Sequence, residues 1–413
     1  MIEIARERGP KPPRDVVYGI YRDGDNNLDR VQSAAIASAE RASADDAHLA
    51  FAVENTTRQG VPSGTLHTED GTIVDGKAQW SRRAPADMAS PAELSHFVER
   101  TLETAHARGG QQAVWIELVD HGGGDGGGLE ADSAHAMMAM PAMANAIAEG
   151  TAAYNALHPD DNRHVEGVVA NQCLMSTLGF AKELSRAGVE YLAASPETMI
   201  APGVPSGTVA EAVQRGGGDP HATAQGVVDA VMDRRYHLDG TPYRPAAAFN
   251  VLDLAPTKIA AMERAVRSVN GDIAALPHDK AGDRAAGTVA QDGAQTRGMV
   301  RFDDDGTLPW HADRPAEALY GKLAGDGRLP VALRRDAAAA AQTVDDLVVA
   351  DREATRFEPG AISYRDAVGP TVHFPVNAKQ YDAWAKNGVS ETDNRFFHDV
   401  GGRDAAGRLG AVA

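Results

Sequence analysis

Short apolar segments that alternate with helical stretches dominate the first 260 residues of the sequence. Most of these segments are apolar on both faces, which is the pattern of strands buried inside a parallel sheet. Their alternation with helices predicts an α/β fold whose mostly parallel sheet is covered by helices on both faces. The segments span residues 16–21, 49–54, 114–119, 165–170, 189–194 and 247–252. Functional sites in such sheets form at the carboxyl ends of the strands, so the residues that follow each segment are the first candidates for function.

Local signals place further elements in this half of the chain. Asp70-Gly71 lies between two alternating segments and predicts the turn of a β-hairpin. Ser90-Pro91 combines a helix cap with a first-turn proline and predicts that a helix begins there. Asn26 and Asn27 are caps for a helix that follows the first strand.

The pattern loosens after about residue 270, where Gly, Asp and Ala dominate. Helical periodicity returns at residues 333–349, and the apolar segment 369–375 is a further strand candidate. We therefore predict a polar tail at residues 1–14, a sheet domain at 15–268, and a C-terminal region at 269–413. The last of these is predicted to be partly helical and to pack partly on the core.

Composition excludes several classes of function. A single cysteine in 413 residues excludes an internal disulfide framework and every thiolate-rich metal site. The net charge of −18 argues against nucleic acid as a partner, because phosphate contacts need clustered Lys and Arg. No run of 18 apolar residues occurs, and the N-terminus has no apolar stretch of signal-peptide length. We expect a monomer with no membrane partner, either cytoplasmic or exported without a cleaved signal peptide.

Two reactive side chains follow successive strands of the predicted sheet. His121 comes directly after the third strand in "VDHGGGDGGG", and Cys173 follows the fourth in "VVANQCLMS". If these strands are neighbours, about 5 Å apart, an imidazole and a thiol can face each other across one site. That arrangement is typical of a thiolate nucleophile with a general acid/base beside it. The imidazolium and the start of the next helix are both expected to lower the pKa of Cys173.

The glycines after His121 complete this hypothesis. An acyl oxyanion needs main-chain donors, and glycine lets the main chain approach a substrate closely. The N–H groups of Gly122 and Cys173 are therefore the candidates for an oxyanion hole.

Other readings of the same residues are open. A cysteine at the end of an apolar strand is often a small core residue, and a histidine before glycines can belong to a turn. The pattern Gly122-x-Gly124-x-x-Gly127 also matches the dinucleotide fingerprint of an oxidoreductase. It does not follow the first strand, however, and no acid ends a following strand at the expected spacing. "HGGG" matches the oxyanion loop of some lipases, but the Gly-x-Ser-x-Gly elbow that those enzymes require is absent.

The order of several motifs resembles the clostripain family of cysteine peptidases. The matching segments are "YRDGDNNLD" (21–29), "VDHGGG" (119–124), "NQCLMS" (171–176), "LAASPETMIAPG" (192–203), "FNVLDL" (249–254) and, more weakly, "GPTVHFP" (369–375). The resemblance implies a caspase–hemoglobinase-like α/β fold, with a peptidase domain at residues 15–268. It implies that His121 is the general acid/base, that Cys173 is the nucleophile, and that peptide bonds are cleaved through an acyl-enzyme thioester. Ser195 and Glu197 are implied to line the substrate cleft.

One position departs from the family pattern. Members that cut after Arg or Lys usually carry an acid two residues before the catalytic cysteine, where this chain has Asn171. Residues two apart on a strand share a face, so Asn171 is predicted to lie beside Cys173 in the substrate pocket. An amide accepts hydrogen bonds but brings no charge, so we expect altered specificity, with cleavage after Arg or Lys as a hypothesis. An inactive or merely peptide-binding member of the same fold is the alternative.

Two further hypotheses concern processing and calcium. Some relatives cut themselves between the His and Cys segments. In this chain, Arg163 is the only Lys or Arg between His121 and Cys173. Asp23 and Asp25 have the spacing of a calcium loop, but Leu28 stands where the loop needs glycine, and a polar loop that caps a helix explains them as well. We expect that no cofactor is required, with calcium as an optional ion.

Overall fold

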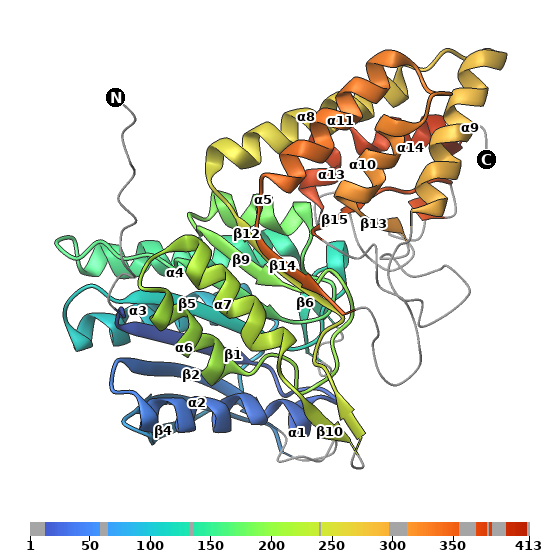
Figure 1. Cartoon of the computed structure of the whole chain (residues 1–413). Coiled ribbons are helices and arrows are strands. Elements are labelled where there is room, and N and C mark those ends of the chain that lie inside the picture. Colours follow the sequence, from blue (N-terminus) through green and yellow to red (C-terminus); the bar gives the residue numbers. More distant parts are fainter. Residues whose placement is uncertain are drawn as a thin grey trace, which may run out of the picture.

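A nine-stranded sheet forms the centre of the computed structural model, which describes residues 13–57, 65–131, 136–238, 241–296, 312–354, 369–377, 380–381 and 394–410. The strand order is β14-β12-β9-β8-β5-β1-β2-β3-β4 (Figure 1). The bounds are β1 Val16–Arg22, β2 Leu49–Thr57, β3 His67–Val74, β4 Lys77–Arg83, β5 Ala113–Val119, β8 Gly167–Asn171, β9 Tyr191–Ala194, β12 Ala248–Asp253 and β14 Val348–Glu353.

The middle of the sheet is parallel and its edges are antiparallel. Strands β9, β8, β5, β1 and β2 run parallel, while β12, β14, β3 and β4 pair antiparallel with their neighbours. Every residue of β1, β5 and β8 is buried, as expected for strands covered on both faces. The predicted mostly parallel α/β sheet is therefore confirmed.

Helices cover both faces and enclose two apolar cores. Helices α2 (Ala34–Asp45), α6 (Ser206–Gly216) and α7 (Pro220–Met232) pack on one face. The opposite face carries α3 (Pro91–Arg108), α4 (Met140–Leu157) and α5 (Leu178–Arg186). The remaining elements of this half are α1 (Asp29–Gln32), the 3-10 turn η1 (Gly124–Gly126), β6 (Gly128–Ala131), β7 (Ala136–Met138), β10 (Tyr236–Leu238) and β11 (Thr241–Tyr243).

The C-terminal region adds a helical body beside the sheet (Figure 1). Among the described residues its helices are α8 (Pro256–Ala274), α9 (Lys280–Gln295), α10 (Ala316–Gly325), α11 (Val331–Asp345), α13 (Arg395–Asp399) and α14 (Gly402–Gly410), with the short strands β13 (Asp313–Pro315) and β15 (Thr371–His373). A boundary at residue 268 falls within α8. The helix predicted at 333–349 ends at Asp345, and the chain then returns to the main sheet as β14. The predicted sheet domain and the predicted C-terminal region therefore both contribute strands to the main sheet.

The predicted position of the hairpin turn is wrong. The turn lies at Asp75-Gly76, where both residues have positive φ (49° and 69°), as a two-residue hairpin turn requires. Gly71 instead lies inside β3, directly opposite Trp80 of β4, and a Cβ at Gly71 would overlap the indole ring. Both Asp-Gly pairs fit the local turn signal. The Trp80 ring packs over Gly71, which places Gly71 inside the strand and leaves the turn to Asp75-Gly76.

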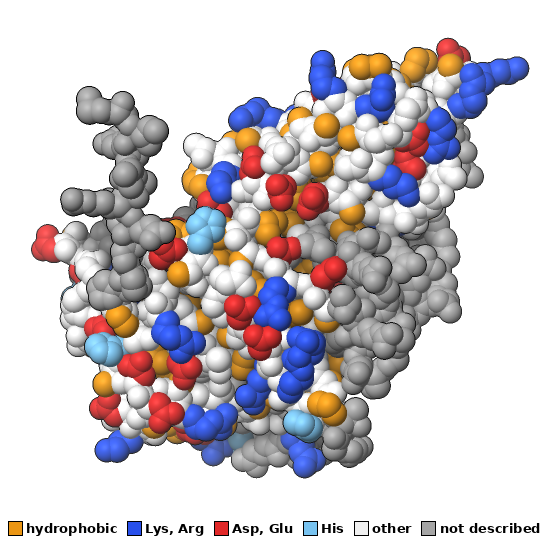
Figure 2. Space-filling view, in the orientation of Figure 1, with side chains coloured by type: hydrophobic (Ala, Val, Ile, Leu, Met, Phe, Trp, Pro, Cys, Tyr) orange, Lys and Arg blue, Asp and Glu red, His pale blue; other side chains and the backbone are white. Residues whose placement is uncertain are grey.

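The described part of the chain contains no helix long and apolar enough to cross a membrane. Figure 2 shows acidic and basic side chains interspersed over one face of the molecule, with no extended surface of one sign.

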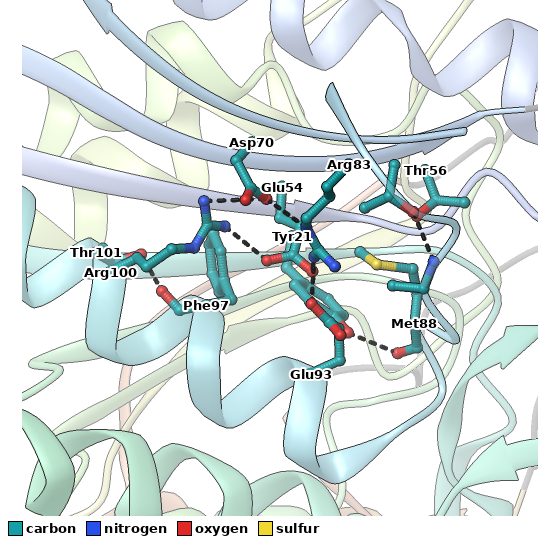
Figure 3. A network of polar contacts seen from close by, with 12 residues as sticks. Tyr21, Glu54, Thr56, Asp70, Arg83, Met88, Glu93, Phe97, Arg100 and Thr101 are labelled. Atoms are coloured by element: carbon teal, nitrogen blue, oxygen red, sulfur yellow. Dashed lines mark hydrogen bonds and ion pairs between the residues drawn. The ribbon is translucent and has the colours of Figure 1, made fainter. Parts of the chain in front are cut away.

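A network of charged side chains fastens the edge hairpin to the sheet and to α3 (Figure 3). Arg83 at the end of β4 bonds to Glu54 on β2 at 2.7 Å, to Glu93 on α3, and to Asp70 at 3.1 Å. Arg100 of α3 contacts the second oxygen of Glu54 at 2.6 Å. Glu54 is fully buried, which raises its pKa to about 8, while the two guanidinium groups favour its charged form.

Replacing Arg83 with alanine is expected to lower the free energy of unfolding by about 2 kcal/mol, because it removes one of the two cations that face a buried carboxylate. The partial exposure of Arg83 keeps the loss below that of a fully buried pair. Urea denaturation measures it. Arg82→Ala is the matched control, because Arg82 is exposed and we expect less than about 0.5 kcal/mol. Equal losses in both variants would contradict the role of the network.

Candidate active site

The carboxyl ends of β5 and β8 bring the two reactive side chains together. These strands are parallel neighbours, with Val119 directly opposite Asn171, so the residues two places further along, His121 and Cys173, leave the sheet side by side. Both line one pocket of about 110 Å³. The other lining residues are Leu28, Gln32, Asp120, Asn171, Gln172, Met199, Ala201, Pro202 and Gly203.

Asn27 orients the imidazole. The Nε2 atom of His121 lies 2.8 Å from Oδ1 of Asn27, so Nε2–H donates to the amide and Nδ1 is the nitrogen left for proton transfer. The sequence predicted Asn26 and Asn27 as helix caps. Neither caps a helix: Leu28 is the N-cap of α1 and no side chain caps that helix, while Oδ1 of Asn26 accepts the Leu28 N–H at 2.8 Å in the preceding turn. The role of Asn27 was missed, because a bond between residues 94 apart leaves no local signal.

The thiol of Cys173 is half-buried at the floor of this pocket. The N–H of Met199 donates to its Sγ at 3.3 Å. Burial raises the pKa of Cys173, and the nearby Asp120 carboxyl acts in the same direction. The predicted lowering of the Cys173 pKa by a helix dipole is wrong, because the helix that follows Cys173, α5, begins only at Leu178. At rest, the group is therefore a neutral thiol.

The raised pKa predicts how the thiol reacts. Iodoacetamide should modify Cys173 slowly at mildly acidic pH, with a rate that increases up to and beyond pH 9, because the thiolate is the reactive form. Intact mass spectrometry over a pH series measures this rate. Fast alkylation at pH 5 to 6 would instead indicate a resting thiolate–imidazolium pair.

Gly122 packs against the main chain of Cys173. A Cβ at position 122 would overlap the carbonyl oxygen of Cys173, so only glycine fits. Bonds from Gly123 N–H to Gly127 O (2.8 Å) and from Leu129 N–H to His121 O (3.2 Å) flank an isolated bridge between Gly122 and Gly128. Within the described residues, the Gly122 and Cys173 N–H groups donate no hydrogen bond. Cys173 lines the pocket, whereas Gly122 is not among its lining residues.

The glycine run does not have the surroundings of a dinucleotide site. It forms η1 and leads into the paired strands β6 and β7. No helix begins at this turn, so the helix N-terminus that would face a pyrophosphate is missing here. The structure around the glycine run therefore does not support the oxidoreductase alternative.

Asn171 lies in the pocket, but its amide is engaged by the protein. Its Nδ2 donates to Glu117 at 2.9 Å, and its Oδ1 accepts from the Val204 N–H at 3.0 Å. Glu117 is fully buried and also accepts a bond from Tyr18. Asn171 therefore fixes the loop that contains Pro202 and Gly203 and offers little to a substrate.

Asp120 supplies a carboxylate to the same pocket. Its Oδ1 accepts a hydrogen bond from Asn26, while its buried Oδ2 has no partner among the described residues. Burial and the neighbouring Asp23 carboxyl raise the pKa of Asp120. Sequence reasoning assigned this residue no role.

Ser195 and Glu197 lie behind the Cys173 loop and do not line the pocket. Ser195 is fully buried, and its Oγ accepts from the Glu197 N–H at 3.1 Å. The carbonyls of Ser195 and Glu197 accept the N–H groups of Ser176 and Leu174 at 3.0 and 3.1 Å. The structure thus corrects the expected contact with substrate to support of the loop.

Arg163 does not lie as a processing site would. Its guanidinium bonds to Asp161 and Gln112 at 2.7 Å and to the Gly110 carbonyl at 2.8 Å, and its side chain is 10% exposed. Cleavage after Arg163 would require extraction of this side chain.

The calcium candidates Asp23 and Asp25 form a buried turn. Oδ1 of Asp23 accepts the Asp25 N–H at 2.8 Å, which is the bond of a polar loop. Burial raises the pKa of Asp23 to about 7. Among the described residues, neither belongs to a cluster of three ligating side chains.

The C-terminal region reaches the Cys173 loop. Thr371 of β15 donates its N–H to the Ser176 carbonyl at 2.8 Å, and Thr371 pairs with Thr177 in an isolated parallel bridge. The late apolar segment 369–375 is thus one part of this region that contacts the Cys173 loop.

Solved structures with the same architecture are cysteine proteases. A secreted C11 cysteine protease from Bacteroides thetaiotaomicron, solved with an irreversible peptide inhibitor, aligns with TM-score 0.62 and 12% identity over 94% of this chain and 98% of that one. An inactive zymogen C11 protease from Parabacteroides distasonis aligns with TM-score 0.61, 12% identity and the same coverage. This chain has the C11 protease fold. No family model and no curated protein matches the sequence. The assignment of the C11 fold is therefore based on architecture, and the chemistry is inferred from the residues of this chain.

Proposed function

We propose that this protein is a cysteine endopeptidase that uses Cys173 and His121 as a catalytic dyad. The observation that carries the proposal is that these side chains leave adjacent parallel strands and line one pocket. The substrate is a protein or peptide. The C11 fold supports this reading, since the solved relatives are proteases and one of them binds a peptide inhibitor.

The geometry supports a sequence of steps that begins from the neutral thiol. Nδ1 of His121 accepts the Sγ proton of Cys173 as sulfur attacks the carbonyl carbon of the scissile bond. The N–H groups of Gly122 and Cys173 donate to the oxygen that becomes negative. The imidazolium then gives its proton to the leaving amine, which leaves a thioester on Cys173. Water, deprotonated by His121, hydrolyses the thioester and restores the thiol.

The residue preference at the cleaved position depends on the pocket walls. Asn171 is occupied by Glu117 and Val204, so it is a poor acceptor for a guanidinium. Asp120 is the pocket carboxyl with an oxygen that accepts no bond from the described residues. Because that oxygen is buried and the pKa of Asp120 is raised, the pocket favours a neutral residue, and cleavage after Arg or Lys is the competing hypothesis.

Asn27→Ala is expected to lower kcat about 10- to 100-fold with little change in KM, because the imidazole loses the bond that fixes its orientation. Asn27→Asp, which keeps an acceptor at that distance, should recover most of the activity. A loss that appears mainly in KM would show that Asn27 binds substrate instead.

A panel of fluorogenic peptides with Arg, Lys, Asn, Asp or Leu at the cleaved position tests the function. We expect hydrolysis of at least one class of peptide without added metal, and calcium is included as a separate condition. Binding of the same peptides to folded protein without any cleavage would favour the alternative, a peptide-binding member of the fold. The half-buried, neutral thiol is the observation in favour of that alternative.

A further inference from the structure

A buried group of three ligand-type side chains lies behind the catalytic loops. Asp125 comes from η1, four residues after His121, while Asp313 comes from β13 and His373 from β15. They are 4%, 1% and 4% exposed. Each offers one oxygen or nitrogen, and these three atoms lie within 4.8 Å of one another.

The backbone places these side chains together. β13 and β15 pair antiparallel with Asp313 directly opposite His373, and opposed residues present their side chains on the same face. Nδ1 of His373 lies 2.8 Å from Oδ1 of Asp313. The N–H of Asp125 donates to the Asp313 carboxylate, which brings the loop after His121 onto the strand pair. The cluster thus follows from register and loop contact.

The charges in the cluster are not balanced by the imidazole. Oδ1 of Asp125 and Oδ2 of Asp313 are buried with no partner at hydrogen-bond distance among the described residues, while the Thr177 and Asn394 side chains lie near the Asp125 carboxyl. The neighbouring Arg314 donates to the Gly293 and Asp313 carbonyls and offsets only part of the charge.

We propose that Asp125, Asp313 and His373 bind one divalent transition-metal ion, with Zn²⁺ and Mn²⁺ as its representatives. Two carboxylates match the charge of such an ion, and a neutral imidazole is the form that binds metal. A mixed nitrogen and oxygen set suits Zn²⁺ or Mn²⁺, whereas Ca²⁺ takes six to eight oxygen ligands.

The ion joins the C-terminal region to the active site. Asp125 belongs to the loop that carries His121, and β15 is already hydrogen-bonded to the loop that carries Cys173 through Thr371 and Ser176. A metal here holds both catalytic loops against one strand pair and touches neither the nucleophile nor the substrate. This gives the C-terminal region a positioning role.

Metal binding is measured on the full-length Cys173→Ala protein, so that Zn²⁺ cannot bind the catalytic thiol. The protein is stripped with a chelator and then dialysed against Zn²⁺, Mn²⁺ or Ca²⁺. We expect one equivalent of Zn²⁺ or Mn²⁺ by elemental mass spectrometry and a rise in Tm of roughly 5 °C, with no such rise from Ca²⁺. Adding Asp125→Asn or His373→Gln to the Cys173→Ala protein should abolish the bound metal and the rise in Tm. Adding Asp404→Asn, which changes an exposed acid on α14, should keep the bound metal and the rise in Tm.

Two results would overturn the proposal. One is the absence of bound metal and of any Tm change in the folded Cys173→Ala protein. The other is full retention of the metal in the Asp125→Asn and His373→Gln variants, which would place the ion elsewhere. Asp313→Asn replaces either variant if it does not fold. All readouts are independent of peptidase activity, so failure of the proposed function would not affect them.

Discussion

Replacing Cys173 with alanine is expected to reduce kcat/KM by at least ~10³-fold on whichever peptide the wild-type protein cleaves, because no other side chain can form the thioester. His121→Ala should lose about as much, since the neutral thiol needs a base before it can attack. The double variant should be no worse than either single variant, because the two residues act as one unit. Initial rates over a substrate series measure all three.

The matched control is His48→Ala, which removes an exposed imidazole at the start of β2. It should leave kcat/KM within about twofold of the wild type, as surface substitutions usually do. Thermal melting of each variant separates lost chemistry from lost fold. More than a tenth of wild-type activity in folded Cys173→Ala would contradict the dyad.

Gly122→Ala is expected to lower kcat by about 10²-fold or more with a smaller effect on KM. The added Cβ would overlap the carbonyl oxygen of Cys173, so one of the two catalytic loops must move. That movement takes the Gly122 N–H away from the oxyanion, and loss of one such donor typically costs 10²–10³ in kcat.

Gly271→Ala is the control for this glycine. It lies within α8, and its added Cβ meets nothing within 4 Å. It should leave kcat and KM unchanged and should raise the stability slightly, because alanine is the better helix former. Wild-type kcat in Gly122→Ala would show that this N–H does not face the reacting oxygen.

The sheet and its reactive edge could be predicted because they depend on patterns that lie close together in the sequence. Strands buried on both faces are apolar throughout, and β1, β5 and β8 show this directly. Parallel strands place their carboxyl ends at one edge, so two side chains just after β5 and β8 could be expected near each other. The pairing of β5 with β8 itself came only from the structure.

The remainder of the site depends on contacts between distant parts of the chain. Asn27 has no sequence signal for its bond to His121, and Asp313 and His373 become neighbours only when β13 pairs with β15. The pKa of Cys173 was expected to fall, but burial and Asp120 raise it. Such effects depend on how tightly the pocket closes, which strand and helix patterns do not encode.

The most direct test is intact mass spectrometry of the protein after incubation with acyloxymethyl ketone peptides, followed by peptide mapping. We expect a single covalent adduct on Cys173 that His121→Ala protein does not form, because the thiol is neutral until the imidazole accepts its proton. Adduct formation at the same rate without His121, or no adduct from any probe with folded protein, would contradict a Cys173–His121 peptidase.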